Sequence, residues 1–268
     1  MIVIKIGGAS GVNLDAVCRD VADLIKQGQP VVLVHGGSAE TNEISTQLGH
    51  PPRFVTSTSG FTSRYTDRQT LEIFAMVTSG KINTLLVERL QKFGVNAFGF
   101  SGIDGRVMAA QRKEAIRIIE NGRKVMLRDD FTGKIETVNG ELIQLLMQAG
   151  LTPVIAPLAI SPEGDALNVD ADRAAAMVAG AVKAEKLIML TNVPGLLRNF
   201  PDESTLISHI SAKDLDQALG FAEGRMKKKI LGASEALGLG VGCIIFADGR
   251  VEHPVLDALN GKGTTIDG

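Results

Sequence analysis

The stretch Met1-Ile-Val-Ile-Lys-Ile-Gly-Gly-Ala-Ser-Gly-Val12 opens the chain and decides its fold. Positions 2, 3, 4 and 6 are all Ile or Val, which predicts a buried β-strand that Lys5 interrupts and Gly7 and Gly8 close. A lysine in a buried strand is costly unless an anionic group meets it. Paired glycines after a strand let backbone N–H groups approach a ligand. The stretch therefore suits a phosphate group and suggests phosphoryl transfer, with an ordinary strand whose lysine reaches solvent as the alternative.

A second strand and a second glycine pair repeat this pattern. Pro30-Val-Val-Leu-Val-His35 predicts a buried strand, and Gly36-Gly37 follows it. Apolar residues at helical spacing over 14–27, with Asn13 as a cap, predict a helix between the two strands. This order indicates a parallel sheet, whose strands end at one crevice where ligands bind. The chain has no G-x-x-x-x-G-K-S/T loop and no G-x-G-x-x-G fingerprint after a strand, which argues against a nicotinamide-dependent dehydrogenase.

The rest of the chain continues the alternation of strands and helices. We expect Ser38 to cap the helix that follows the second strand. The other expected elements are a hairpin or loop in 49–66, a helix over 67–92, antiparallel strands in 106–138, strands at 153–157, 186–191 and 242–247, a helix that opens at 169 or 170, a basic helix over 224–239 and an edge strand at 263–266. We place the division between two lobes so that they comprise residues 1–160 and 161–268.

The composition argues against several classes of function. The formal net charge is −2, Trp is absent and Tyr occurs once, so neither charge nor aromatic stacking indicates a nucleic-acid partner. Cys18 and Cys243 lie far apart in apolar contexts, which fits a reducing compartment. We find no signal peptide and no apolar run of membrane-spanning length, and we therefore expect a cytoplasmic protein with no membrane partner.

Three polar clusters farther along the chain could serve the same crevice. Asn168, Asp170 and Asp172 alternate up to a helix start, with helix capping as the alternative interpretation. Gly224-Arg-Met-Lys-Lys-Lys229 carries four cations, with a solvated basic face as the alternative. Arg64 suits a clamp on a carboxylate, with an exposed surface arginine as the alternative. We expect no direct metal ligand, because no cluster of acids or histidines completes a site.

Taken together, these motifs resemble the amino-acid kinase superfamily, and specifically its acetylglutamate-kinase branch. They follow the family's order over nearly the whole chain, so the set is highly specific although single glycine pairs are weak signals. The matching motifs are Lys5-Ile-Gly-Gly8, His35-Gly-Gly37, Arg64-Tyr-Thr-Asp67, Asn168-Val-Asp-Ala-Asp172, Leu190-Thr-Asn-Val-Pro-Gly195 and Gly224-Arg-Met-Lys-Lys-Lys229.

The resemblance implies a three-layer αβα sandwich around an open, mainly parallel sheet of the carbamate-kinase-like type. The lobe 1–160, with a hairpin lid, would bind the acceptor, and the lobe 161–268 would bind ATP. The implied reaction transfers the γ-phosphoryl group of ATP to a side-chain carboxylate and gives an acyl phosphate, with Mg²⁺ held mainly by the nucleotide phosphates. Because a carboxylate acceptor needs no base, we expect a structural role for His35.

The resemblance also implies a role for each matched residue. Lys5 and Lys229 would neutralise the phosphoryl group in flight, and Asp172 would orient the two lysines. The amides of Gly8 and Gly36 would donate to that group. The acceptor would contact Gly36, Gly37, Arg64 and Asn168. The nucleotide would lie along Lys5, Gly7, Thr191, Asn192, Gly195, Leu196, Met226 and Lys229.

The acceptor loop departs from the acetylglutamate pattern. The second glycine pair is followed by Ser38 where a third Gly is usual, the segment 50–63 before Arg64 is longer, and Asp170 stands where Asn is common. These features, with Gly102-Ile-Asp-Gly-Arg106, look more like the kinases of the aminoadipate route to lysine. In that route the acceptor, 2-aminoadipate, is attached to a small acidic carrier protein. Carrier-linked glutamate for ornithine and arginine, free N-acetylglutamate, and a non-catalytic amino-acid-binding regulator remain as alternatives.

The charge of one segment supports an acidic partner, with a solvated hairpin as the alternative. Residues 106–128 carry two acids against seven cations, which are Arg106, Arg112, Lys113, Arg117, Arg123, Lys124 and Arg128. Such a rim would steer an acidic carrier. From the resemblance we also expect a homodimer.

Overall fold

The computed structural model describes residues 1–58, 60, 62–112, 115–120, 123–215, 219–220 and 224–268. Its centre is an eight-stranded sheet in which β15 and β16 are antiparallel and the other neighbours are parallel. The predicted fold class is confirmed. Across the sheet the strands are β14 (His209–Ser211), β16 (Thr264–Asp267), β15 (Cys243–Asp248), β13 (Lys186–Thr191), β1 (Ile2–Ile6), β2 (Val31–His35), β10 (Thr152–Ala156) and β5 (Ala97–Ser101).

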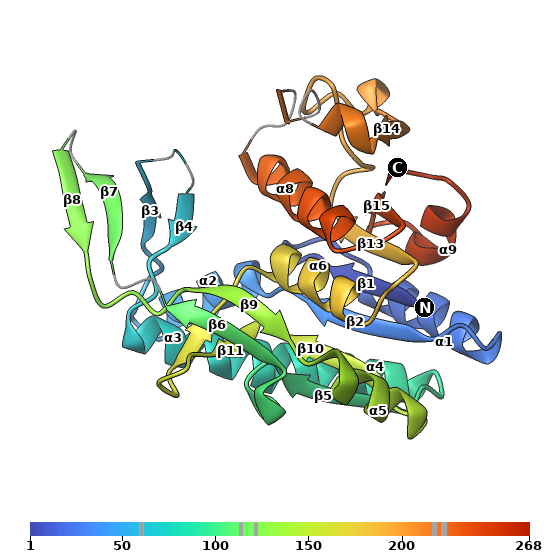
Figure 1. The fold of residues 1–268 in the computed structure, drawn as a ribbon, viewed down its shortest axis with the longest axis horizontal. Helices are drawn as coiled ribbons and strands as arrows, with labels where there is room; N and C mark the ends of the chain where they lie inside the picture. Colours follow the sequence, from blue (N-terminus) through green and yellow to red (C-terminus); the bar gives the residue numbers. More distant parts are fainter. Residues whose placement is uncertain (59, 61, 113–114, 121–122, 216–218, 221–223) are drawn as a thin grey trace.

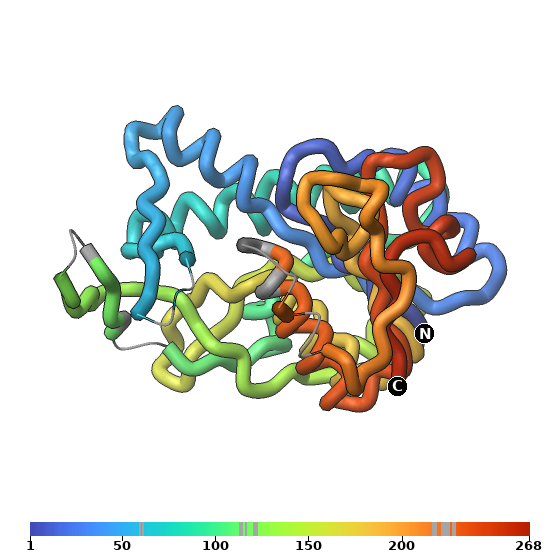
Figure 2. Tube along the Cα trace, turned by 90° about the horizontal axis from the view of Figure 1, so that it is seen from above, coloured from blue at the N-terminus to red at the C-terminus, as the bar shows by residue number. Residues whose placement is uncertain are grey.

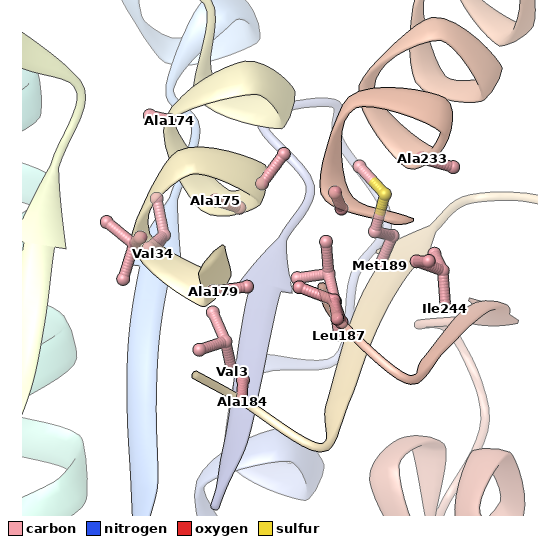
Figure 3. Close-up of a cluster of buried hydrophobic side chains, with 14 of the residues drawn as sticks. Val3, Val34, Ala174, Ala175, Ala179, Ala184, Leu187, Met189, Ala233 and Ile244 are labelled. Atoms are coloured by element: carbon pink, nitrogen blue, oxygen red, sulfur yellow. The ribbon is translucent and has the colours of Figure 1, made fainter. Parts of the chain in front are cut away.

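Helices cover both faces of this sheet (Figure 1). One face carries α5 (Gly140–Gln148), α6 (Ala171–Ala181) and α8 (Gly224–Gly238). Figure 3 shows Val3 and Val34 of the sheet beneath the small side chains of α6, such as Ala175. Because alanines occupy little space, α6 lies close to the strands. Side chains alternate along a strand, so Lys5, two residues after Val3, points toward this same face.

On the opposite face of the sheet, helices pack against odd-numbered residues of β2, including Val31 and Leu33. Its helices are α1 (Leu14–Lys26), α2 (Ser38–Gln47), α9 (Pro254–Leu259) and one long segment built from α3 (Arg68–Ala75), the π-helix η1 (Met76–Asn83) and α4 (Thr84–Lys92). Asn13 caps α1 with its side chain, as predicted, and Asp67 caps α3 in the same way.

Two expectations about local structure are corrected. Gly37, and not Ser38, is the cap residue of α2, and the Ser38 hydroxyl instead donates to the carbonyl of Gly8 at 3.2 Å. The C-terminal strand β16 is not an edge strand, because β14 pairs with its outer side. Short 3₁₀ turns occur at Asp104–Arg106, Glu203–Thr205 and Ala212–Asp214.

Smaller sheets project from the main one. A four-stranded sheet has the order β12 (Ala166–Asn168), β11 (Leu158–Ile160), β6 (Met108–Arg112) and β9 (Gly133–Val138). Two hairpins, β3–β4 (Phe54–Thr56, Thr62–Arg64) and β7–β8 (Ile116–Glu120, Arg123–Leu127), stand side by side at the end of the molecule away from both termini (Figures 1 and 2).

The expected division after residue 160 falls between β11 and β12, which pair with each other. The main sheet also runs through both halves of the chain without interruption. The two lobes are therefore halves of one continuous sheet. Among the described helices, none is both long and apolar enough to cross a membrane.

Candidate active site

The two glycine turns lie against each other at the carboxyl ends of β1 and β2. The strands are adjacent and parallel, with Ile6 opposite His35 in the register. A Cβ atom on Gly8 would overlap the backbone N of Gly37, and one on Gly36 would lie 2.7 Å from the N of Gly8. Because backbone stands on both sides, neither position can accept a side chain without displacing the other turn.

The hydrogen bonds of these turns correct one predicted donor. The N–H of Gly36 donates to the carbonyl of Ile6 at 2.9 Å and so belongs to the β-ladder. In the described part of the chain, by contrast, no hydrogen bond is found from the N–H of Gly8 or of Gly37. Gly8 and Gly37, and not Gly8 and Gly36, are therefore the two turn amides that can donate to a ligand.

A triad of charges lies beside the turns. Nζ of Lys5 is 2.8 Å from Oδ1 of Asp172, and Nζ of Lys229 is 2.9 Å from Oδ2 of the same carboxylate. The Lys5 side chain is 5% exposed, so the interpretation in which it reaches solvent is wrong. Asp172 lies in the first turn of α6, two residues after Asp170, whose side chain caps that helix. Lys229 comes from α8, which packs on α6.

Burial and charge pull the pKa values of this triad in opposite directions. Burial lowers the pKa of the Lys5 ammonium, while Asp172 raises it and Lys229 lowers it further. Burial alone would raise the pKa of Asp172, but Lys5 and Lys229 outweigh that effect and hold it well below its usual range. Within the triad itself, one carboxylate faces two ammonium groups, so an excess of positive charge remains for an anion.

A cavity of about 910 Å³ opens over the triad. All the residues predicted for the site line it, namely Lys5, Gly7, Gly8, Gly36, Gly37, Arg64, Asn168, Asp172, Thr191, Asn192, Gly195, Leu196, Met226 and Lys229. The cavity also has apolar lining residues that sequence reasoning missed, among them Phe54, Phe74, Pro157 and Phe200. No motif marked them, because an apolar residue carries no sequence signal of which cavity it faces.

On one side of the triad the cavity is lined by groups suited to a carboxylate. Arg64 is 8% exposed, so the interpretation as a surface arginine is wrong. Its guanidinium lies 5.2 Å from the ring centroid of Phe54 and donates to the carbonyl of Ser38 at 3.3 Å. Asn168 donates through Nδ2 to the hydroxyl of Thr66 at 3.0 Å. These contacts fix both polar heads at the cavity wall.

On the other side the chain after β13 forms a rigid turn. The hydroxyl of Thr191 donates to the carbonyl of Val193 at 2.9 Å and accepts from its N–H at 3.0 Å. The N–H of Leu196 donates to the hydroxyl of Thr264 at 2.8 Å, and a Cβ on Gly195 would lie 2.6 Å from that hydroxyl oxygen. Gly195 is therefore needed for the close approach of this turn to β16, which holds Leu196 and its neighbours against the cavity.

The basic segment does not form one patch. Arg112 stacks on Phe131, 3.8 Å from the ring centroid, and pairs with Asp165 at 3.2 Å, so its charge is engaged within the fold. Arg106 lies in the 3₁₀ turn before β6, apart from the hairpin, and Lys113 lies outside the described residues. The cations that remain exposed together are those of the β7–β8 hairpin and its end: Arg117, Arg123, Lys124 and Arg128.

The fold and the site together define a class of protein. An open parallel sheet with two glycine turns at its strand ends, and with the ammonium groups of Lys5 and Lys229 beside them, is suited to bind and transfer a phosphoryl group. In the part of the chain that the structure describes, no three His, Cys, Asp or Glu side chains gather as a metal site. The polar groups that the site does offer to an anion are the ammonium groups of Lys5 and Lys229 and the turn amides.

Comparison with known proteins gives the family. Residues 1–247 match the model of the amino acid kinase family, and the chain belongs to this family. The [LysW]-aminoadipate kinase of Deinococcus radiodurans is 56% identical, over 99% of this chain and 91% of that protein. The enzyme of the same name from Thermus thermophilus is 51% identical, over 99% of this chain and all of that one. The predicted enzyme class, a kinase with a carboxyl group as acceptor, is thereby confirmed.

Solved structures agree with the fold. N-acetylglutamate synthase from Neisseria gonorrhoeae, complexed with coenzyme A and N-acetylglutamate, superimposes with a TM-score of 0.81 at 26% identity. The match covers all of this chain and 59% of the synthase chain. The fold is thus shared with a larger protein.

Proposed function

We propose that this enzyme transfers the γ-phosphoryl group of ATP to the side-chain carboxylate of 2-aminoadipate linked to a small acidic carrier protein. The product is an acyl phosphate on the path to lysine. The observation that carries the proposal is the Lys5–Asp172–Lys229 triad at the middle of a cavity whose two walls suit different ligands. The carrier-linked acceptor is supported by the two [LysW]-aminoadipate kinases, each more than 50% identical to this chain.

The reaction brings an anionic carboxylate up to an anionic triphosphate. At an effective dielectric constant of 20, each pair of like unit charges 4 Å apart costs about 4 kcal/mol. Lys5 and Lys229 offset this repulsion, and Asp172 holds their ammonium groups together without cancelling their charge. The N–H groups of Gly8 and Gly37 add two fixed donors. Because phosphoryl transfer needs little covalent chemistry from the protein, charges and hydrogen-bond donors in fixed positions are sufficient for catalysis.

The cavity divides between the two substrates in our proposal. ATP lies on the side of residues 161–268, along Thr191, Asn192, Gly195, Leu196 and Met226. Mg²⁺ is held mainly by the nucleotide phosphates and adds positive charge there. The acceptor lies on the side of residues 1–160, where Arg64 holds a carboxylate and Gly37 and Asn168 complete its binding.

We propose the β7–β8 hairpin as the surface that steers the carrier. Its exposed cations, Arg117, Arg123, Lys124 and Arg128, create a positive field beside the acceptor side of the cavity. Such a field raises the association rate of an acidic partner and weakens with salt. We expect kcat/KM for the carrier substrate to fall as ionic strength rises. The variant Lys124→Glu should lower it further, whereas Lys26→Glu, on the exposed end of α1, should not. A salt-independent KM for the carrier would remove this surface from the proposal.

We also propose a cytoplasmic homodimer. The edge strand β5 and the helices beside it expose Phe98, Met76 and Leu85, with 42%, 57% and 44% of each residue accessible in the monomer. Light scattering should give the mass of two chains, and Phe98→Asp should shift it to one.

The decisive test of substrate compares three acceptors under one set of conditions with ATP in excess. Carrier-linked aminoadipate should turn over fastest, and carrier-linked glutamate should be accepted less well, because one methylene is worth only about 1–3 kcal/mol in a pocket. Free N-acetylglutamate should be slow. Brisk turnover of free N-acetylglutamate alone would replace the proposed acceptor with the acetylglutamate alternative. No acyl phosphate from any acceptor would favour the non-catalytic regulator.

A further inference from the structure

A buried histidine next to the second glycine turn has a defined proton position. His35 is 1% exposed and points to the face of the sheet opposite Lys5. Its Nδ1 lies 3.0 Å from the carbonyl oxygen of Gly36, and its Nε2 lies 3.0 Å from Nδ2 of Asn83. The same Nδ2 lies 3.0 Å from the carbonyl of Val154, which can only accept. The Asn83 atom between Val154 and His35 must therefore be the NH₂ nitrogen, which donates to both. Nε2 of His35 accepts this bond, so the ring proton sits on Nδ1 and is donated to the carbonyl of Gly36.

The π-helix η1 delivers Asn83 to this point. Asn83 is 4% exposed and lies against β5, where a Cβ atom on Gly99 would overlap its side-chain oxygen. The same helix presses on the glycine turn itself. A Cβ atom on Gly37 would lie 2.7 Å from Cδ1 of Ile82 and 2.9 Å from Cγ2 of Thr78. The turn is thus fixed from behind by packing at Gly37 and by a hydrogen bond at Gly36.

We propose that Asn83 and His35 are positioning residues for phosphoryl transfer. They fix the carbonyl of Gly36 on the side of the turn away from the cavity. The N–H of Gly37 belongs to the same peptide group and points the opposite way, so it faces the transferred group. Neither side chain lines the cavity, so both act through the turn. The inference rests on the proposed function in one respect: it takes the group that the Gly37 amide faces to be the transferred phosphoryl group.

The surroundings of His35 keep this hydrogen bond in one state. Burial, together with the charge of Lys5 on β1, lowers the pKa of His35 to about 4, against the smaller opposing effect of its bond to Gly36. Within the described residues, Lys5 is the one charged group recorded as acting on the ring. Near neutral pH the ring is neutral, and the Asn83 amide keeps its acceptor on Nε2.

The variant Asn83→Asp tests the arrangement with almost no change of shape. A carboxylate accepts from Nε2–H, so it favours the imidazolium and raises the pKa of His35. We expect kcat to fall by about 10-fold or more, with less than a twofold change in KM for ATP, because the Gly37 donor acts on charge that develops during transfer. The pH profile of kcat should gain an ionisation absent from the wild type. Asn96→Asp, at the exposed junction before β5, is the matched control and should leave kcat and its pH profile unchanged.

A second pair of variants covers the case in which Asn83→Asp does not fold. The side-chain amide of His35→Asn can replace the Nδ1–H donor, whereas His35→Leu cannot, so the first should retain at least several-fold more kcat. In the wild type, ¹⁵N chemical shifts should show His35 with its proton on Nδ1. A proton on Nε2, a folded Asn83→Asp enzyme with wild-type kcat, or equal kcat in the two His35 variants would each overturn the inference. All comparisons use the acceptor that the wild type turns over best, so a wrong acceptor assignment would show in the wild type and leave this test intact.

Discussion

The substitution Asp172→Asn removes the carboxylate that pairs with both Lys5 and Lys229. In the wild type the Lys5–Asp172 contact at 2.8 Å is worth about 6 kcal/mol of gross attraction at an effective dielectric constant of 20. Desolvation of the ions offsets part of this, and relaxation and loss of a proton by a lysine offset more. Breaking a buried pair by removing one partner typically costs about 3–5 kcal/mol, and we expect a loss of free energy of unfolding in that range.

The assay pairs urea unfolding, followed by circular dichroism at neutral pH, with kcat from coupled release of ADP. Asp172→Asn should lose stability and activity together. The double variant Asp172→Asn/Lys5→Met removes the ammonium left without its partner, so it should recover much of the stability while kcat stays at least about 10²-fold low. A folded Asp172→Asn enzyme with a stability loss under about 1 kcal/mol or near-normal kcat would refute the reasoning, as would a double variant no more stable than the single one.

Three further predictions follow from the same geometry. Lys5→Ala or Lys229→Ala should lower kcat by at least about 10²-fold while the far-ultraviolet spectrum stays native, and near-normal turnover in either would reject the clamp. Gly8→Ala should reduce thermal stability and kcat together, because its Cβ would overlap the opposite turn; a calorimetric trace identical to that of the wild type would contradict the packing. His35 makes stability depend on pH: its pKa is 6.5 in the unfolded chain and about 4 in the fold, so the unfolded state binds more protons in this window. Stability should therefore fall as pH drops from above 6.5 toward 4, by up to about 3 kcal/mol from this group, and His35→Gln should flatten that part of the curve. An unchanged slope in His35→Gln would show that other groups are responsible.

Much of the fold and of the site follows from local sequence. The apolar runs of β1 and β2 each end in a glycine pair, which is enough to predict adjacent parallel strands with their turns at one crevice. Lys5 in a buried strand requires an anion, and the structure supplies Asp172. Asp170 satisfies its helix-capping interpretation. These predictions succeeded because the signal and its cause lie within a few residues of each other.

The remaining features depend on which distant segments meet. The register of β1 and β2 engages the N–H of Gly36 with Ile6 and leaves that of Gly37 for a ligand, a choice that spacing alone does not specify. The sequence presents Arg112 as one of seven cations in the basic segment, but in the fold it contacts Phe131 and pairs with Asp165. The contact of Asn83 with His35 joins residues 48 positions apart. Asn83 lies in a π-helical segment, which the spacing of apolar residues does not predict.

The most direct test of the central claim is to trap the product with hydroxylamine. The enzyme is mixed with ATP and carrier-linked aminoadipate, the reaction is quenched with hydroxylamine, and the carrier is analysed by mass spectrometry. We predict one hydroxamate on the side-chain carboxylate of the linked aminoadipate, formed in step with ADP by the wild type and absent with Lys5→Ala. Release of ADP without a hydroxamate on the carrier, or an equal yield from the Lys5→Ala enzyme, would contradict the account.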